Sequence, residues 1–119
     1  KIESKQLAQR IAQAAKSKKA EQVVILDVSK VCDFCDYFVI SSGNSLRQTG
    51  AIAQAIQDDL ETVGIKSLSR VSPSDESGWI ALDFVSIIAH SFHKPMREFY
   101  ALENLWSDAK KVRITAVKS

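Results

Sequence analysis

Two cysteines and two histidines are the residues whose spacing most directly suggests chemistry. Cys32 and Cys35 form a C-x-x-C pair, which is typical of a redox dithiol or of half a zinc site. His90 and His93, the only histidines, complete a formal set of four ligands. His90 falls inside an alternating apolar strand, however, so we expect His93 to point to the opposite face. We therefore predict no metal site and no cofactor, and a reduced cysteine pair in a loop.

A glycine turn, Ser41-Ser42-Gly43-Asn44-Ser45, joins a predicted strand to a predicted helix. Backbone N–H groups and the helix dipole favour anions at such a position, so the turn is suited to a nucleotide phosphate. A nucleotidyltransferase would also need paired carboxylates to hold two metal ions. The next acids along the chain, Asp58 and Asp59, are neighbours on a helix and do not share a face. We interpret the turn as a well-capped helix start and predict that the chain is not an enzyme.

The remaining polar residues do not form a recognisable catalytic set. His90 lies next to Ser91 in an apolar strand, where a lone histidine is more often structural. Other acids fall at strand ends or in loops, and sequence alone does not bring them together: Asp27, Asp33, Asp36 and Asp83.

The elements that must position these residues follow from hydrophobic periodicity. Apolar residues three and four apart predict helices, whereas short β-branched or alternating runs predict strands. Ser45 and Gln48 form an S-x-x-Q capping box, and Gly64 suits the end of the same helix. The predicted order α-β-β-α-β-β-β-α indicates an α/β or α+β domain, a mixed sheet flanked by helices. The segments are residues 7–16, 23–28, 37–40, 45–64, 68–71, 79–83, 85–92 and 95–106.

Length and charge limit the organisation of the chain. Its 119 residues fit one domain, which we place at residues 1–106, followed by a flexible basic tail at 107–119. No apolar run is long enough for a membrane span, and we expect a cytoplasmic protein. The tail carries a charge of +3 and the whole chain +2, so residues 1–106 carry −1 and the domain itself is close to neutral. A near-neutral domain is a poor nucleic-acid binder, which leaves at most an incidental contact of the tail with RNA.

Large aromatic residues are concentrated in the last third of the chain, among a few charges. Tryptophan, tyrosine and arginine dominate the hot spots of protein interfaces, and one hairpin and one helix need fewer aromatics than this for a core. We therefore favour a protein-binding module over an enzyme. The cluster comprises Trp79, Phe84, Phe92, Phe99, Tyr100 and Trp106, with Asp83, Arg97 and Glu103.

Three motifs in the same order carry a resemblance to the ribosome-silencing (Iojap) family. Residues 36–47 resemble its D-Y-F-V-I-x-S-G-x-S-x-R segment. Residues 79–83 with 87–92 resemble its tryptophan-led hairpin, and residues 97–106 resemble its R-x-F-Y-x-L-E-x-L-W ending. The resemblance covers about residues 7–106.

The resemblance implies a fold and a partner. The family's fold is similar to that of nucleotidyltransferases, here without the catalytic carboxylates. Its members bind the large ribosomal subunit at ribosomal protein L fourteen and block joining of the small subunit; a role in large-subunit assembly is also implied. We expect a partner-facing surface that comprises Trp79, Leu82, Asp83, Phe84, Arg97 and Tyr100.

One departure and two other functions stay open at this point. Val85 and Ser86 replace the family's Gly-Asp, so the hairpin turn is expected to differ in type and Asp83 in placement. The alternatives are a nucleotide-binding enzyme on the transferase-like fold, or an RNA-binding assembly factor that uses the basic tail. Oligomeric state is also open, a homodimer included.

Overall fold

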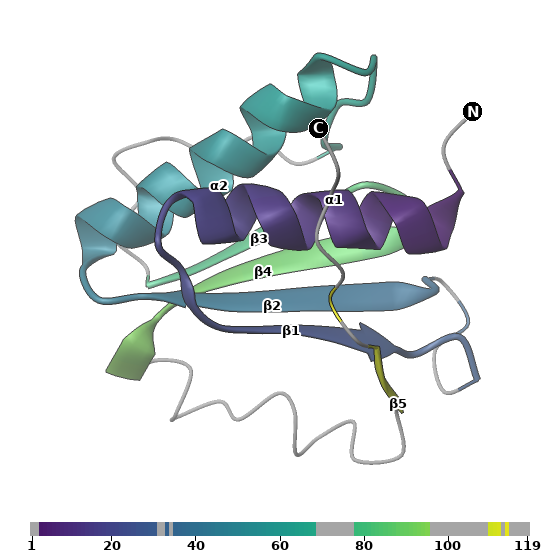
Figure 1. Ribbon diagram of the computed structural model, residues 1–119, viewed down its shortest axis with the longest axis horizontal. Coiled ribbons are helices and arrows are strands. Elements are labelled where there is room, and N and C mark those ends of the chain that lie inside the picture. The colour runs from purple at the N-terminus through teal and green to yellow at the C-terminus, as the bar shows by residue number, and fades with distance from the viewer. Residues whose placement is uncertain are drawn as a thin grey trace.

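A five-stranded mixed sheet forms the centre of the molecule, and two helices lie side by side against one of its faces (Figure 1). The computed structural model describes residues 3–30, 33, 35–68, 78–95, 110–112 and 114. Among the described strands the order is β3-β4-β2-β1-β5; β2 and β4 pair in parallel, and the other pairs are antiparallel. The elements are α1 Ser4–Ser17, β1 Glu21–Asp27, β2 Tyr37–Gly43, α2 Leu46–Glu61, β3 Trp79–Asp83, β4 Ile87–His93 and β5 Lys110–Val112.

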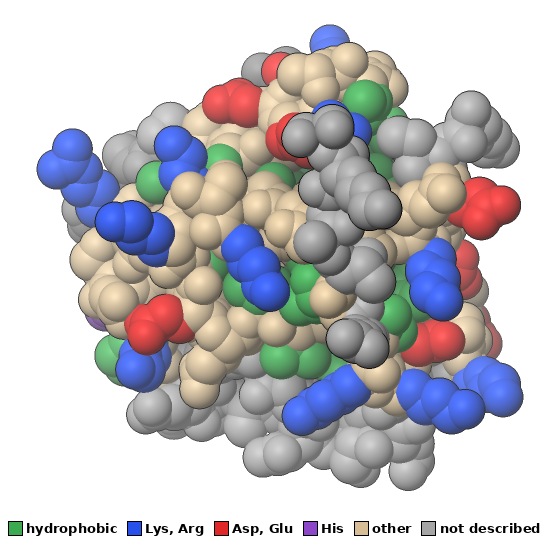
Figure 2. Space-filling view, viewed as in Figure 1, with side chains coloured by type: hydrophobic (Ala, Val, Ile, Leu, Met, Phe, Trp, Pro, Cys, Tyr) green, Lys and Arg blue, Asp and Glu red, His purple; other side chains and the backbone are tan. Residues whose placement is uncertain are grey.

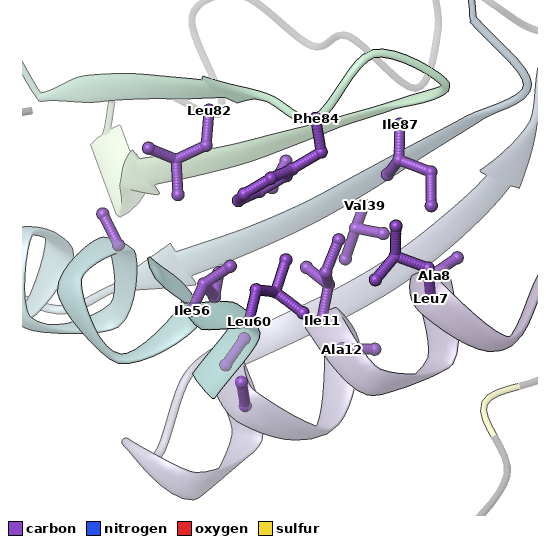
Figure 3. Close-up of a cluster of buried hydrophobic side chains, with 14 of the residues drawn as sticks. Leu7, Ala8, Ile11, Ala12, Val39, Ile56, Leu60, Leu82, Phe84 and Ile87 are labelled. Atoms are coloured by element: carbon purple, nitrogen blue, oxygen red, sulfur yellow. The ribbon is translucent and has the colours of Figure 1, made fainter. Parts of the chain in front are cut away.

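The larger of two core clusters lies between the helices and the sheet (Figure 3). Helix α2 buries Ile52, Ile56 and Leu60, the face that its periodicity predicts. Helix α1 buries Leu7 and Ile11 in the same way. From the strands, every second residue points toward the helices: Ile25, Val39, Ile80, Leu82, Ile87 and Ala89.

The opposite face of the sheet carries a second apolar cluster. Because side chains alternate along a strand, the residues between those of the first cluster point the other way. They include Leu26, Phe38, Ile40 and Phe92, all nearly inaccessible to solvent. The sheet is therefore apolar on both faces, and its strands are fixed in register from both sides.

The start of α2 is held by the predicted capping box. Ser45 is the N-cap, and its Oγ accepts a hydrogen bond from the backbone N–H of Gln48 at 3.0 Å. The Gln48 side chain turns back and accepts from the N–H of Asn44 at 2.6 Å. Beyond the helix, Gly64 has φ +79°, the left-handed conformation that favours glycine.

The predicted mixed sheet and fold class are confirmed, with one difference at the carboxyl-terminal end. Residues 110–112, expected in a flexible tail, form β5, which pairs antiparallel with β1, and Val112 packs against the larger cluster. A three-residue strand with two lysines has too little pattern to be predicted from sequence. Residues 69–71 of the predicted third strand and 96–106 of the predicted last helix lie outside the described residues.

Candidate functional site

Strand β3 lies at the edge of the sheet formed by the described strands, and its face turned away from the helices presents the candidate site. Trp79, Ala81 and Asp83 point to that face, while Ile80 and Leu82 point into the larger core cluster. Trp79 and Asp83 are half-buried, whereas Ala81 between them is exposed. This alternation along the strand places an indole and a carboxylate on one strip with a small side chain between them.

The Trp79 side chain is fixed by its neighbours. Its indole Nε1–H donates to His90 Nδ1 at 3.0 Å, and its ring stacks on Phe92 with centroids 5.2 Å apart and planes at 20°. A half-buried tryptophan held in this way loses little side-chain freedom when a partner covers it. Rigid aromatic side chains of this kind make effective contact residues.

His90 is a buried, neutral imidazole. Its Nδ1 accepts from Trp79, so the ring proton lies on Nε2, which has no hydrogen-bond partner within the described part of the chain. Burial lowers the pKa of His90 from 6.5 to about 4, because a charged ring would lose its hydration. His90 therefore supports Trp79 and is uncharged at neutral pH.

Asp83 lies at the end of β3, where the chain turns into β4. Its Oδ1 accepts from the backbone N–H of Val85 at 2.8 Å, and its backbone oxygen accepts from the N–H of Leu68 at 2.7 Å. Val85 adopts φ +75°, an unusual conformation for a β-branched residue. The turn thus has a positive φ at a residue other than glycine. Val85 and Leu68 are 67% and 71% exposed, so apolar side chains flank the carboxylate.

Two of the expected partner-facing residues do not face outward. Leu82 and Phe84 are 1% and 5% exposed and belong to the larger core cluster. Both side chains were expected to face a partner, and their burial conflicts with that expectation. Side chains alternate along a strand, so Leu82 and Phe84 point inward when Trp79 and Asp83 point to the other face. Arg97 and Tyr100 lie outside the described residues. Alternation along the strand predicts that Ala81 is exposed, but Ala81 was not among the expected partner-facing residues. No local sequence pattern indicates that Leu68 lies beside Asp83.

The cysteine and histidine set is not brought together. Cys35 is buried in the second cluster, Cys32 lies outside the described residues, and His93 lies at the other end of the sheet. Within the described ranges no three His, Cys, Asp or Glu side chains gather closely enough to hold a metal ion. Asp27 accepts hydrogen bonds from the hydroxyl and N–H of Ser29, which lower its pKa. Asp27 therefore stabilises a turn.

The glycine turn before α2 is packed and capped. The N–H groups of Asn44 and Gln48 already have side-chain acceptors, as described above. A Cβ on Gly43 would lie 2.8 Å from the Thr49 backbone nitrogen, so this glycine permits close packing of the helix on β2. The interpretation as a capped helix start agrees with these contacts.

The site and fold together describe an α+β protein that presents an edge-strand face. A crystal structure from Bacillus halodurans has the same fold: the TM-score is 0.79 and 33% of residues are identical, over 92% of this chain and 99% of that one. The family model described as "Ribosomal silencing factor during starvation" matches residues 1–119. The chain belongs to this family, the ribosomal silencing factors.

Named relatives agree with this membership. The ribosomal silencing factor of Halalkalibacterium halodurans is 35% identical over 99% of this chain and 100% of its own length. That of Bacillus subtilis is 39% identical over 82% of each chain. The mouse protein named "Mitochondrial assembly of ribosomal large subunit protein 1" is 28% identical over 77% of this chain and 41% of its own.

No helix in the described ranges combines the length and the apolar character that crossing a membrane requires.

Proposed function

We propose that this protein is a cytoplasmic, non-enzymatic repressor of translation that binds the large ribosomal subunit at ribosomal protein L fourteen and blocks joining of the small subunit. Membership of the ribosomal silencing factors supports the ribosomal role. The contact surface in this proposal is the outer face of β3 with its turn. Trp79, Ala81 and Asp83 supply the strip, and Val85 and Leu68 extend it; Arg97 and Tyr100 stay in the proposal on sequence grounds.

The chemistry of this strip suits a basic, partly apolar protein surface. The fixed indole of Trp79 offers apolar area at low entropic cost, and the Asp83 carboxylate can pair with a cation across the interface. Exposed Val85 and Leu68 give that pair apolar neighbours that exclude water. Assembly of the large subunit is a second outcome of the same contact.

Sedimentation tests the proposed function directly. The protein should co-sediment with free large subunits, and adding it should slow the joining of purified large and small subunits. Co-sedimentation with small subunits alone, or an unchanged joining rate at saturating protein, would contradict the proposal.

Ala81→Arg should weaken binding to large subunits by about 2 kcal/mol or more, roughly thirtyfold, because a long charged side chain would separate the strip from its partner. Ala81 is exposed, so the fold should be preserved. The matched control is Ala51→Arg on the exposed side of α2, which should bind normally. Binding is measured with labelled protein and purified subunits. Equal binding by both variants would place the interface elsewhere.

Asp83→Lys tests the charge of the strip, and Asp83→Asn separates that charge from the turn. The asparagine keeps an Oδ1 that can accept from Val85 N–H, so the turn should persist. We expect a large loss of subunit affinity for the lysine variant, because like charges then meet in a desolvated contact, and a smaller loss for the asparagine variant. Near-wild-type circular dichroism for both would exclude unfolding as the cause. Unchanged affinity of the lysine variant would remove Asp83 from the interface.

A further inference from the structure

Cationic side chains that are distant in sequence meet at one end of the molecule. The end of α1 and the loop after it supply Lys16, Lys18 and Lys19; the first turn of α2 supplies Arg47; and Lys94 follows the end of β4. We call these five residues the basic end. In Figure 2, blue side chains gather over the end of α1 and the beginning of α2.

Hydrogen bonds fix the elements that carry these charges. The Gln48 side-chain amide donates to the backbone oxygens of Lys18 and Lys19, both at 3.1 Å, and so joins the loop after α1 to the first turn of α2. In the parallel pair of β2 and β4, His93 lies opposite Gly43, so Lys94 emerges beside the same turn. The basic end is therefore built by three elements that the fold holds together.

The charges of the basic end are available to a partner. None of its five side chains forms an ion pair with another residue in the described ranges. Lys16, Lys18, Lys19 and Arg47 are exposed, and Lys94 is half-buried. Among the described residues of this end, Glu21 is the acid that offsets them, so the local charge is strongly positive although the whole chain carries only +2.

Lys19 stands where glycine would be favoured. It follows the last turn of α1 with φ +61°, a left-handed conformation that is strained for a residue with a Cβ. Its backbone N–H bonds the oxygen of Lys16, the usual closure of a helix end. The side chain here thus carries a conformational cost and forms no ion pair with the described residues, a pattern that indicates a role outside the folded domain.

We propose that the basic end binds the phosphodiester backbone of RNA. Several long, flexible cations spread over one end of a molecule match a string of phosphates, which need positive charge and no shaped pocket. A membrane would need apolar side chains to insert, and among the described residues Leu46, at 37% exposure, is the one large exposed hydrophobic at this end. The inference rests on the proposed function in one respect: RNA is the polyanion that surrounds a protein docked on a ribosome.

A short labelled RNA duplex tests the basic end without any ribosomal protein. The variant K18Q/K19Q/R47Q is compared with K5Q/K30Q/K66Q, which removes three exposed lysines elsewhere and leaves the same net charge. Fluorescence anisotropy gives the dissociation constant at several salt concentrations. K18Q/K19Q/R47Q should bind the duplex roughly tenfold more weakly, or weaker still, at about 0.1 M salt. Its plot of log affinity against log salt concentration should also be less steep, with a slope smaller in magnitude by about two to three. The second variant should bind like the wild type.

Equal loss in the two variants, or loss in neither, overturns the proposal. Tighter binding of the wild type to phosphatidylglycerol vesicles than to the duplex also overturns it, in favour of a membrane surface. Lys19→Gly removes one charge and relieves the backbone strain, so it should keep or raise the melting temperature while RNA affinity falls severalfold. The wild type could bind the duplex, lose that binding in K18Q/K19Q/R47Q, and yet not bind large subunits. That result would refute the proposed function and leave this inference standing.

Discussion

Ile56→Ala is expected to lower the free energy of unfolding by about 2–5 kcal/mol, a large fraction of the roughly 5–15 kcal/mol of a typical domain. Ile56 is 1% exposed and points from α2 toward the strands, within the larger core cluster (Figure 3). Deleting its three outer carbons removes buried apolar contacts and leaves a cavity. Residues on both sides hold that cavity open, because Leu60 and Ile52 occupy the neighbouring turns of the same helix.

Urea unfolding followed by circular dichroism measures this effect. Ile56→Val, which deletes a single methyl group, should cost about 0.5–1.5 kcal/mol, so the two variants form a graded pair. Asp58→Ala, on the exposed side of the same helix, should change stability by less than either. Equal stability of Ile56→Ala and the wild type would mean that α2 does not bury this face.

Acidification from pH 7 to pH 4 should destabilise the fold by up to about 3 kcal/mol through His90 alone. Its pKa is 6.5 when unfolded and about 4 when folded, so the unfolded chain binds the proton more readily. The contribution of His90 to stability is therefore complete above about pH 6.5 and declines as the pH falls toward 4. Geometry gives the same sign, because a proton on Nδ1 would oppose the indole N–H that donates to it.

His90→Gln is the informative variant, since its amide oxygen can accept from Trp79 Nε1 but does not titrate. Its unfolding free energy should vary less between pH 7 and pH 4 than that of the wild type, by about the same 3 kcal/mol. The matched control is His93→Gln at the end of the same strand. Its unfolding free energy should keep the wild-type dependence on pH, because His90 is still present. Identical pH dependence in His90→Gln and the wild type would show that His90 does not control acid stability.

Periodicity and capping determined most of the fold in advance. The helix faces of α1 and α2, the Ser45 cap and the β3–β4 hairpin each depend on residues within a few positions of one another. Local spacing is enough to specify such features, because a helix or strand presents one stripe to any core. The same period of two places Trp79 and Asp83 on the outer face of β3, whereas Leu82 and Phe84, also expected to face a partner, are buried. The motifs likewise determined the family.

Only the tertiary structure decided what lies beside what. The pairing of β5 with β1 joins segments far apart in sequence, as does the contact of Leu68 with Asp83 at the hairpin turn. Charge gives the clearest case. The side-chain charges of the domain sum to nearly zero, which suggests a poor RNA binder. Folding, however, brings Lys18, Lys19, Arg47 and Lys94 to one end. Electrostatic attraction depends on distances in space, and sequence separation contains no information about them until the chain is folded.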